Sequence, residues 1–183
     1  REFLGFGKVT TNNLDTDNNN AIYRKTVQEF NTSNYYAQGN ILSSYVSDAS
    51  DNLYNKETNE YYSYGVTASG NQYNFETLSP SHNSAYSPLK YNKKESFEGS
   101  NTGITLSESW YGYNVTGSGL KFGELATFKY SDKGNLGNNG SGTYDYQTTI
   151  GYHNITSNGK YIWGLPNLVT VNSNGNTLLR KSS

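Results

Sequence analysis

The stretch Tyr144-Asp145-Tyr146-Gln147-Thr148-Thr149-Ile150-Gly151-Tyr152 decides the fold class. Every second residue from Tyr144 to Tyr152 is aromatic or β-branched, so these side chains share one face of an extended strand. A second stretch upstream has the same period and predicts the neighbouring strand, with one face formed by Leu120, Phe122, Ala126, Phe128 and Tyr130. A period of two over this length predicts β-sheet.

Further strands are predicted on both sides of this pair. Residues 21–30 are β-branched and aromatic without a breaker, and residues 62–68 and 73–77 predict a hairpin around Ser69-Gly70-Asn71. Asn-Gly steps, which favour tight hairpin turns, divide the C-terminal third into a meander of strands at about 143–156, 160–164, 167–172 and 176–180. These steps are Asn139-Gly140, Asn158-Gly159 and Asn174-Gly175.

The expected fold is therefore all-β and antiparallel, a barrel or sandwich of about ten to twelve strands. Gly, Asn, Ser and Thr recur too often for a helical stripe, so no helix is predicted. We expect residues 1–183 to form a single domain, with loops at 14–20 and 79–99. The second loop holds two of the three prolines and is a possible boundary between two lobes.

Tyrosine is the informative feature of the composition. The chain has 18 Tyr, 26 Asn and 19 Gly in 183 residues, whereas Leu, Ile, Val and Phe together number only 34. Tyr must therefore fill part of the core, and the remaining rings should stand on the surface as contact area. Surfaces rich in Tyr, Asn, Ser and Gly suit non-covalent recognition.

Charge, hydropathy and cysteine usage exclude several classes. The net charge of −1 argues against a nucleic-acid partner, and no apolar run approaches the roughly 20 residues that span a bilayer. The absence of Cys excludes disulfides and Cys-ligated metal. The chain begins with Arg1, which we take as a sign of processing or excision, and we expect a bacterial protein that is secreted or lies on the outer cell surface. Its oligomeric state stays open.

Four tyrosines are the candidate ligand-binding residues: Tyr111, Tyr113, Tyr61 and Tyr62. Alternation places Trp110 on the face of Ile104 and Leu106, as core, so Tyr111 points outward. Tyr61 and Tyr62 are consecutive, so at least one of them should be exposed. The alternative is ordinary packing of a half-buried sheet.

Glu108 and Glu124 are the only candidates for catalysis. Each is in phase with a row of apolar residues, where a carboxylate is costly unless it is paired or hydrogen-bonded. Two carboxylates that face each other are the usual catalytic residues of a glycosidase. Three arrangements without catalysis are also consistent with this pattern: a bulge next to Gly123 that flips the phase, pairing with a lysine, or exposure to water in the mouth of a barrel.

No metal or cofactor is predicted. His82 and His153 are the only histidines and have no metal spacing, although His82 on a loop could ligate a haem iron. Asp15, Asp17 and Asn19 begin like a calcium loop, but the required Gly and Glu do not follow, so a polar turn is expected. The lysines at 90, 93 and 94 could contact an acidic partner or belong to a solvated loop.

Residues 124–136 (Glu124-Leu125-Ala126-Thr127-Phe128-Lys129-Tyr130-Ser131-Asp132-Lys133-Gly134-Asn135-Leu136) resemble a hairpin from the small C-terminal barrels of Gram-negative surface lipoproteins. The family is that of transferrin-binding protein B and its haem- or haemoglobin-capturing relatives, in which an Ala-Thr-Phe strand precedes a Lys/Asn/Gly turn. The resemblance implies capture of a host ligand at a surface, and it transfers no binding residue.

The expected function is non-enzymatic recognition of a host protein or a carbohydrate, as in an adhesin. Tyr and Trp rings would supply contact area, and Asn, Ser and the Asn-Gly loops would supply hydrogen bonds. Two alternatives belong to other classes: a glycan hydrolase that uses Glu108 and Glu124, and a coat or fibre subunit that assembles through an unpaired edge strand.

Overall fold

The structure is a computed structural model, and it describes residues 5–33, 35–67, 72–74, 82–98, 100–114, 123–155 and 162–182. Within these residues the chain is all-β, with thirteen strands and no helix. The strands are β1 (Lys8–Asp15), β2 (Ala21–Phe30), β3 (Ile41–Asp48), β4 (Leu53–Tyr61), β5 (Tyr64–Thr67), β6 (Gln72–Asn74), β7 (His82–Tyr86), β8 (Leu89–Ser96), β9 (Ile104–Asn114), β10 (Glu124–Asp132), β11 (Tyr146–Ile155), β12 (Ile162–Ser173) and β13 (Asn176–Ser182).

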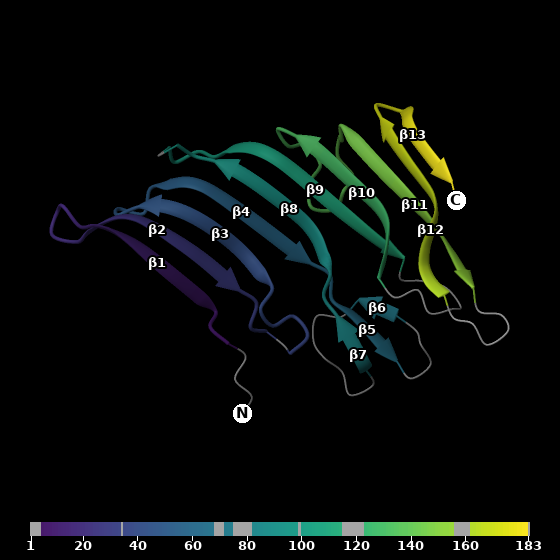
Figure 1. Cartoon of the computed structure of the whole chain (residues 1–183), viewed down its shortest axis with the longest axis horizontal. Coiled ribbons are helices and arrows are strands. Elements are labelled where there is room, and N and C mark those ends of the chain that lie inside the picture. Colours follow the sequence, from purple (N-terminus) through teal and green to yellow (C-terminus); the bar gives the residue numbers. More distant parts are fainter. Residues whose placement is uncertain are drawn as a thin grey trace.

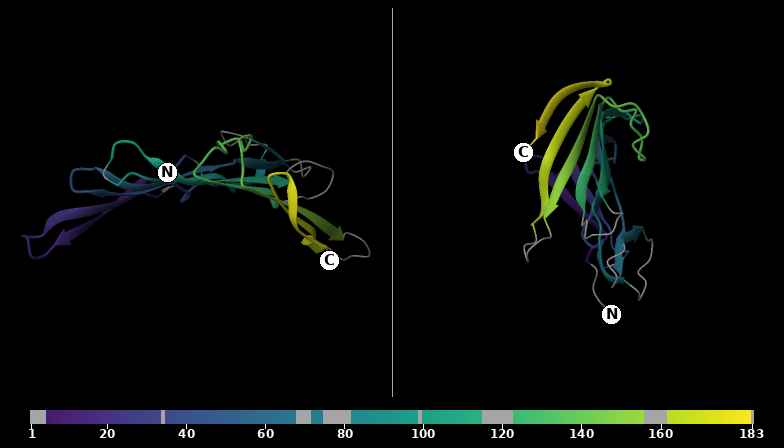
Figure 2. Two further views of the ribbon diagram at one scale, coloured as in Figure 1. Left: turned by 90° about the horizontal axis from the view of Figure 1, so that it is seen from above. Right: turned by 90° about the vertical axis from the view of Figure 1, so that its right-hand side faces the viewer.

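Ten of these strands form one large antiparallel sheet, in the order β1-β2-β3-β4-β8-β9-β10-β11-β12-β13. Its neighbours follow one another along the chain except between β4 and β8, so the sheet is a meander, as predicted for the C-terminal third. Among the described residues β1 and β13 have a partner on one side only, so the sheet is open rather than closed into a barrel. Figures 1 and 2 show a single curved layer with β1 and β13 at opposite ends.

A second, three-stranded sheet with the order β6-β5-β7 is inserted between β4 and β8. The chain leaves and re-enters the large sheet at adjacent points, because Tyr61 pairs with Leu89 and the Tyr62 amide donates to the Pro88 carbonyl at 2.9 Å. The predicted hairpin is present as β5 and β6, and its turn lies outside the described residues. Residues 79–99, expected as a loop, instead contain β7 and β8.

Two bulges change which residues share a face. β9 has an extra residue at Leu106, opposite the step from Lys94 to Glu95. Ile104 and Leu106 are therefore not in phase with Trp110, and they are 71% and 50% exposed. The prediction that they form core with Trp110 is wrong, because a bulge reverses the alternation.

In β10 the extra residue is Ala126, between Leu125 and Thr127. Glu124 pairs with Asn114 and Phe128 pairs with Tyr111, so Glu124 and Phe128 lie on opposite faces of the sheet. The predicted shared face is therefore wrong as well. The sequence is consistent with a bulge next to Gly123, and the structure has one at Ala126, three residues further along the chain.

The Asn-Gly steps behave differently from one another. Asn174 and Gly175 have φ values of 48° and 80° and join β12 to β13, as a type I′ turn requires. Asn139-Gly140 lies instead in a long loop between β10 and β11, and Asn158-Gly159 lies outside the described residues. The strands expected at 160–164 and 167–172 are a single strand, β12, with a bulge after Pro166, where a residue without an N–H is tolerated.

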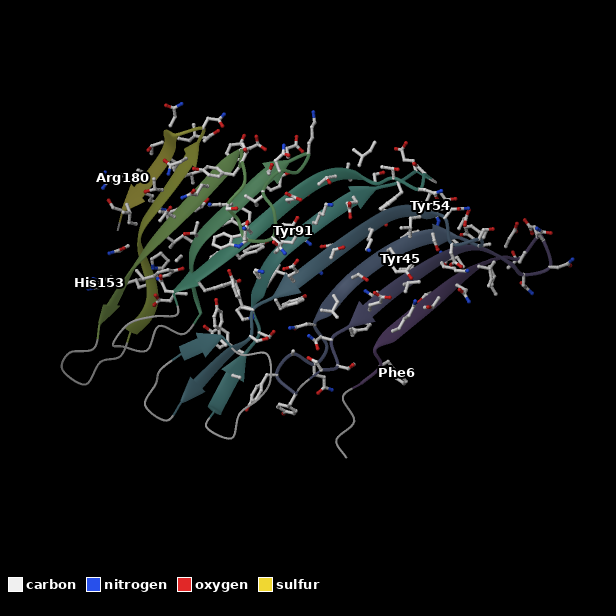
Figure 3. The ribbon with its side chains drawn as sticks, turned by 180° about the vertical axis from the view of Figure 1, so that it is seen from behind. Phe6, Tyr45, Tyr54, Tyr91, His153 and Arg180 are labelled. Carbon is white, nitrogen blue, oxygen red and sulfur yellow. The ribbon has the colours of Figure 1, made fainter. Side chains whose placement is uncertain are left out.

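Few of the described apolar side chains are fully buried. The buried apolar side chains among the described residues are Val27, Ala37, Tyr64, Tyr91 and Leu136. Figure 3 shows Tyr91 near the middle of the large sheet, with Phe6 and Arg180 toward its two ends. Leu136 belongs to the connection between β10 and β11, and Glu108 accepts hydrogen bonds from both the Leu136 amide and the Tyr91 hydroxyl.

Candidate functional site

The connection between β10 and β11, residues 133–145, lies over the convex face of the large sheet (Figure 2). We call it the 133–145 loop. Lys133, Gly134, Gly137 and Gly140 all have positive φ values, between 66° and 74°. Compact loops of this kind are often functional because a rigid scaffold presents them to solvent.

Glu108 of β9 anchors the beginning of this loop. Its Oε2 accepts backbone N–H bonds from Asn135, Leu136 and Gly137 at 3.0, 2.7 and 3.2 Å, and its Oε1 accepts the Tyr91 hydroxyl at 2.6 Å. Three consecutive amides around one carboxylate form an anion-binding nest. Burial raises the pKa of Glu108, but the hydrogen bonds from Tyr91 and the backbone outweigh it and lower the pKa below its ordinary value of 4.5.

Lys129 of β10 anchors the second part of the loop. Its Nζ donates to the Gly140 carbonyl at 2.6 Å and lies 5.6 Å from the Trp110 ring and 5.3 Å from the Tyr144 ring. The backbone at Gly140 approaches Trp110 so closely that a Cβ there would collide with the indole ring. Trp110 is thus half-buried beneath the loop.

Four tyrosines gather where the small sheet joins the large one, and we call Tyr62, Tyr64, Tyr86 and Tyr113 the tyrosine cluster. The Tyr62 ring stacks on Tyr64 with centroids 5.0 Å apart and meets Tyr113 edge-on at 6.1 Å, while Tyr64 lies 5.3 Å from Tyr86. Burial raises the pKa of Tyr113 to about 12, so its phenol stays neutral at ordinary pH. Tyr64 is buried, and the other three rings keep part of their surface in solvent.

Charged and amide groups border Tyr62 on one side. Glu60 accepts hydrogen bonds from Lys90 Nζ and from Asn138 Nδ2, both at 3.1 Å. The same Lys90 Nζ lies 5.9 Å from the centre of the Tyr62 ring. The 133–145 loop therefore reaches Glu60 through Asn138, and Lys90 connects Glu60 to the partly exposed ring of Tyr62.

The four predicted ligand-binding tyrosines are not all in one place. Tyr62 and Tyr113 contact each other within the tyrosine cluster. Tyr111 packs its ring against Phe128 at 5.2 Å, and the Tyr61 hydroxyl donates to the Ile41 carbonyl at 3.1 Å. Tyr61 and Tyr62 are both half-buried, so neither fully meets the expectation of an exposed ring.

Glu108 and Glu124 do not converge. Glu108 pairs with Ser131 and Glu124 pairs with Asn114, so the two carboxylates lie six residues apart along β9, about 20 Å at the rise of a strand. Glycosidase carboxyl groups lie about 5–9.5 Å apart. Glu108 is moreover fully occupied in holding the 133–145 loop.

The remaining candidates show no assembled site. Among the described residues there is no group of three His, Asp or Glu side chains that could hold a metal ion. His153 is exposed, whereas the side chain of His82 lies outside the described set. Asp15 caps a polar turn by accepting the Asp17 amide at 3.1 Å. In the same part of the chain no helix is long and apolar enough to cross a membrane.

The surplus of tyrosine rings predicted from composition is present. Of the tyrosine side chains described, only Tyr64 and Tyr91 are buried, and five are at least 36% exposed. The five are Tyr23, Tyr35, Tyr36, Tyr54 and Tyr146.

Glu60, Lys90 and Asn138 are functional candidates that the sequence does not reveal. Lys90 stands out there only as part of a lysine cluster, and that cluster lies on a strand, where Lys90 pairs with Glu60 and Lys93 pairs with Glu95 at 2.7 Å. The one signal in the sequence is the position of Asn138, because it directly precedes an Asn-Gly step in a Gly-rich segment.

Comparison with family models gives no match, and comparisons with curated proteins and with solved structures give none either.

Proposed function

We propose that this protein is a non-enzymatic binding protein of the cell exterior that recognises a glycan through the tyrosine cluster and the neighbouring 133–145 loop. The observation that carries the proposal is the arrangement around Tyr62. Its ring is partly exposed, Tyr113 and Lys90 lie against it, and Glu60, which accepts hydrogen bonds from Lys90 and Asn138, connects it to the 133–145 loop.

This combination suits a sugar. An aromatic face can stack on the apolar face of a pyranose, while carboxylate, ammonium and amide groups satisfy its hydroxyls. Asn138 lies on a loop whose backbone is hydrogen-bonded to Glu108 and Lys129, and such anchoring lowers the entropy lost when a ligand binds. The wide separation of Glu108 and Glu124 favours binding over hydrolysis.

A glycan array with the purified chain tests the proposal. Tyr62→Ala and Asn138→Ala should each weaken binding by about tenfold or more, because a stacking ring or a direct hydrogen bond contributes about 1.4 kcal/mol or more. Tyr23→Ala is the matched control, since Tyr23 is 53% exposed on β2 and belongs to no cluster. Thermal unfolding of each variant checks that the fold is intact.

Two outcomes would overturn the assignment. One is glycan binding that neither Tyr62→Ala nor Asn138→Ala weakens. The other is an empty array combined with capture of a defined protein from host serum, which would replace the glycan by a host protein.

The open edges of the sheet favour a second candidate, a coat or fibre subunit. β1 and β13 each lack a partner on one side among the described residues, and every described residue of β13 is exposed. Unblunted edges can pair with further copies. Growth of open-ended polymers with concentration would favour this candidate, and a closed species of fixed mass would exclude it.

A further inference from the structure

One face of β9–β13 is mainly apolar. One row runs Tyr111–Phe128–Thr148–Val171–Leu179 from strand to strand, and the flanking rows run Ser109–Tyr130–Tyr146 on one side and Ile150–Val169–Lys181 on the other. Residues paired across strands share a face, and so do residues two apart along a strand. We call this surface the aromatic face: Tyr111, Phe128, Tyr130, Tyr146, Ile150, Val169, Val171 and Leu179.

The opposite face of the same strands is polar. The row next to the central one runs Gly112–Thr127–Thr149–Thr170–Arg180, and the following row runs Trp110–Lys129–Gln147–Asn172. The 133–145 loop also lies on this side, because its anchor Lys129 belongs to it. β9–β13 thus have the pattern of an antiparallel sheet with one face in water and the other packed on a core.

No described residue supplies that core. All eight residues of the aromatic face keep solvent-accessible surface, and Tyr146 and Leu179 are 47% and 55% exposed. The chain as a whole exposes 11,460 Å². A compact monomer of its 20.3 kDa mass would expose about 8,800 Å². The excess of about 2,700 Å² is as large as the surface buried in many stable dimers.

We infer that a second copy of this chain covers the aromatic face, so that two open sheets pack face to face as a two-fold dimer. The one charged side chain within these rows is Lys181, which pairs with Val169 at the β13 edge; the uncharged remainder of the face is self-complementary in the way that a two-fold contact requires. The net charge of −1 adds little repulsion between copies. The two aromatic faces then enclose one shared core, as the two sheets of a sandwich do at about 10 Å separation.

The dimer leaves the polar side of the proposed glycan site open, whereas Tyr113, which is in phase with Tyr111, borders the aromatic face. Glu60, Tyr91, Trp110 and Lys129 are paired in turn across neighbouring strands, so their side chains share one face of the sheet. Because Lys129 anchors the 133–145 loop, Glu60 lies on the side of the sheet that carries this loop. Asn138 belongs to that loop. The polar groups beside Tyr62 therefore lie on the side of the sheet away from the second copy.

Sedimentation equilibrium on the intact chain tests the dimer. A mass of twice 20.3 kDa is expected over protein concentrations of about 1 to 100 μM, a range in which ordinary dimers are populated. Tyr146→Glu and Leu179→Glu place charges in the shared core and should each weaken dimerisation by about 30-fold or more. Both side chains are already half-exposed in the single chain, so neither change should unfold it.

Gln147→Glu is the matched control, because it adds the same charge on the neighbouring residue of the opposite face. It should leave the dimer intact. A monomer at all concentrations would overturn the inference. So would equal dimer affinities for the two variants of the aromatic face, Tyr146→Glu and Leu179→Glu, and for the control Gln147→Glu. Glycan binding measured on the Tyr146→Glu variant separates this result from the proposed function, since that binding should persist in the monomer.

Discussion

The two halves of the large sheet are stabilised by different kinds of interaction. In β1, β2, β3, β4 and β8, which we call the polar half, both faces carry polar side chains. One row runs Lys8–Glu29–Ser43–Thr58–Lys93, and the adjacent row, on the other face, runs Val9–Gln28–Ser44–Glu57–Lys94. In β9–β13, the amphipathic half, one face is apolar and the other polar.

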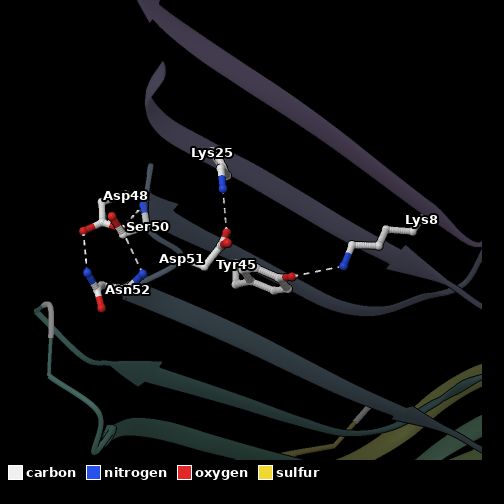
Figure 4. A network of polar contacts seen from close by, with 7 residues as sticks. All are labelled: Lys8, Lys25, Tyr45, Asp48, Ser50, Asp51 and Asn52. Atoms are coloured by element: carbon white, nitrogen blue, oxygen red, sulfur yellow. Dashed lines mark hydrogen bonds and ion pairs between the residues drawn. The ribbon is translucent and has the colours of Figure 1, made fainter. Parts of the chain in front are cut away.

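The polar half is held by its backbone ladder and by polar contacts between neighbouring strands. Figure 4 shows the contacts around the turn between β3 and β4. Asp48 accepts the Ser50 and Asn52 amides at 2.8 and 2.9 Å, and Lys25 Nζ reaches Asp51 Oδ1 at 2.8 Å. Such exposed contacts each contribute little.

The difference shows where single side chains matter. Apart from the buried Val27 and Tyr91, stability in the polar half is spread over many weak contacts, so no one exposed polar residue there should be critical. In the amphipathic half it is concentrated in the few buried groups under the 133–145 loop. Matched substitutions in the two halves can test this contrast.

The largest effect is expected for Glu108→Ala. It leaves three loop amides and the Tyr91 hydroxyl without their acceptor and should lower the free energy of unfolding by about 3 kcal/mol. In the polar half, Glu29 accepts a hydrogen bond from the Ser43 hydroxyl at 2.7 Å, and its carboxylate lies 3.7 Å from Lys8 Nζ. Glu29→Ala should therefore lower the free energy of unfolding by about 1 kcal/mol or less. Urea unfolding measures both. Equal losses would contradict the contrast.

The pH dependence of stability should follow the same carboxylate. Because the pKa of Glu108 is lower in the folded protein than its ordinary 4.5, the unfolded chain takes up the proton first as the pH falls. The stabilisation is therefore complete above the ordinary value and is lost as the pH falls through the folded pKa. Between about pH 5 and 3 the wild-type protein should lose more stability than Glu108→Gln. Parallel losses would show that other groups govern acid unfolding.

An intermediate effect is expected for Gly140→Ala. The substitution forces an L-residue to a φ of 67° and pushes its Cβ into Trp110, which should cost about 2 kcal/mol. Gly39→Ala is the control in the polar half, since Gly39 has a φ of 81° but no atom within 4 Å of the added Cβ. It should cost about 1 kcal/mol from the backbone alone. Thermal unfolding would show whether the collision adds to the strain.

The smallest effect is expected for Lys25→Ala. Its partner Asp51 is 73% exposed, so the pair should contribute about 0.5 kcal/mol or less and should weaken further in high salt. A loss above about 2 kcal/mol in chemical denaturation would mean that the polar half also depends on single contacts.

Sequence reasoning succeeds where one local signal decides the structure. The run from Ala21 to Phe30 has no breaker and forms β2 with the same bounds. Asn174-Gly175 forms the expected tight turn because both residues reach positive φ at low cost. The surplus of exposed tyrosine follows from composition alone.

Reasoning from the sequence fails where the structure depends on contacts between distant parts of the chain. The bulges at Leu106 and Ala126 leave no signal in alternation, yet each reverses the faces of the residues beyond it. Tyr62 and Tyr113 are far apart in the sequence, and only the order of strands in the sheet brings them together. The role of Glu108 depends on backbone amides from Asn135 to Gly137, which no side-chain pattern reveals.

The pairing of Tyr61 with Leu89, where β4 and β8 meet at the base of the small sheet, has a consequence for protein engineering. Because β4 and β8 close directly on each other, the excursion that contains β5–β7 is inserted at one point of the large sheet and contacts it through the tyrosine cluster. The entropy of closing such an excursion grows only with the logarithm of its length. Foreign peptides or whole tags spliced between β5 and β6 should be displayed without disturbing the ten-stranded scaffold, which makes this point the natural graft site of the molecule.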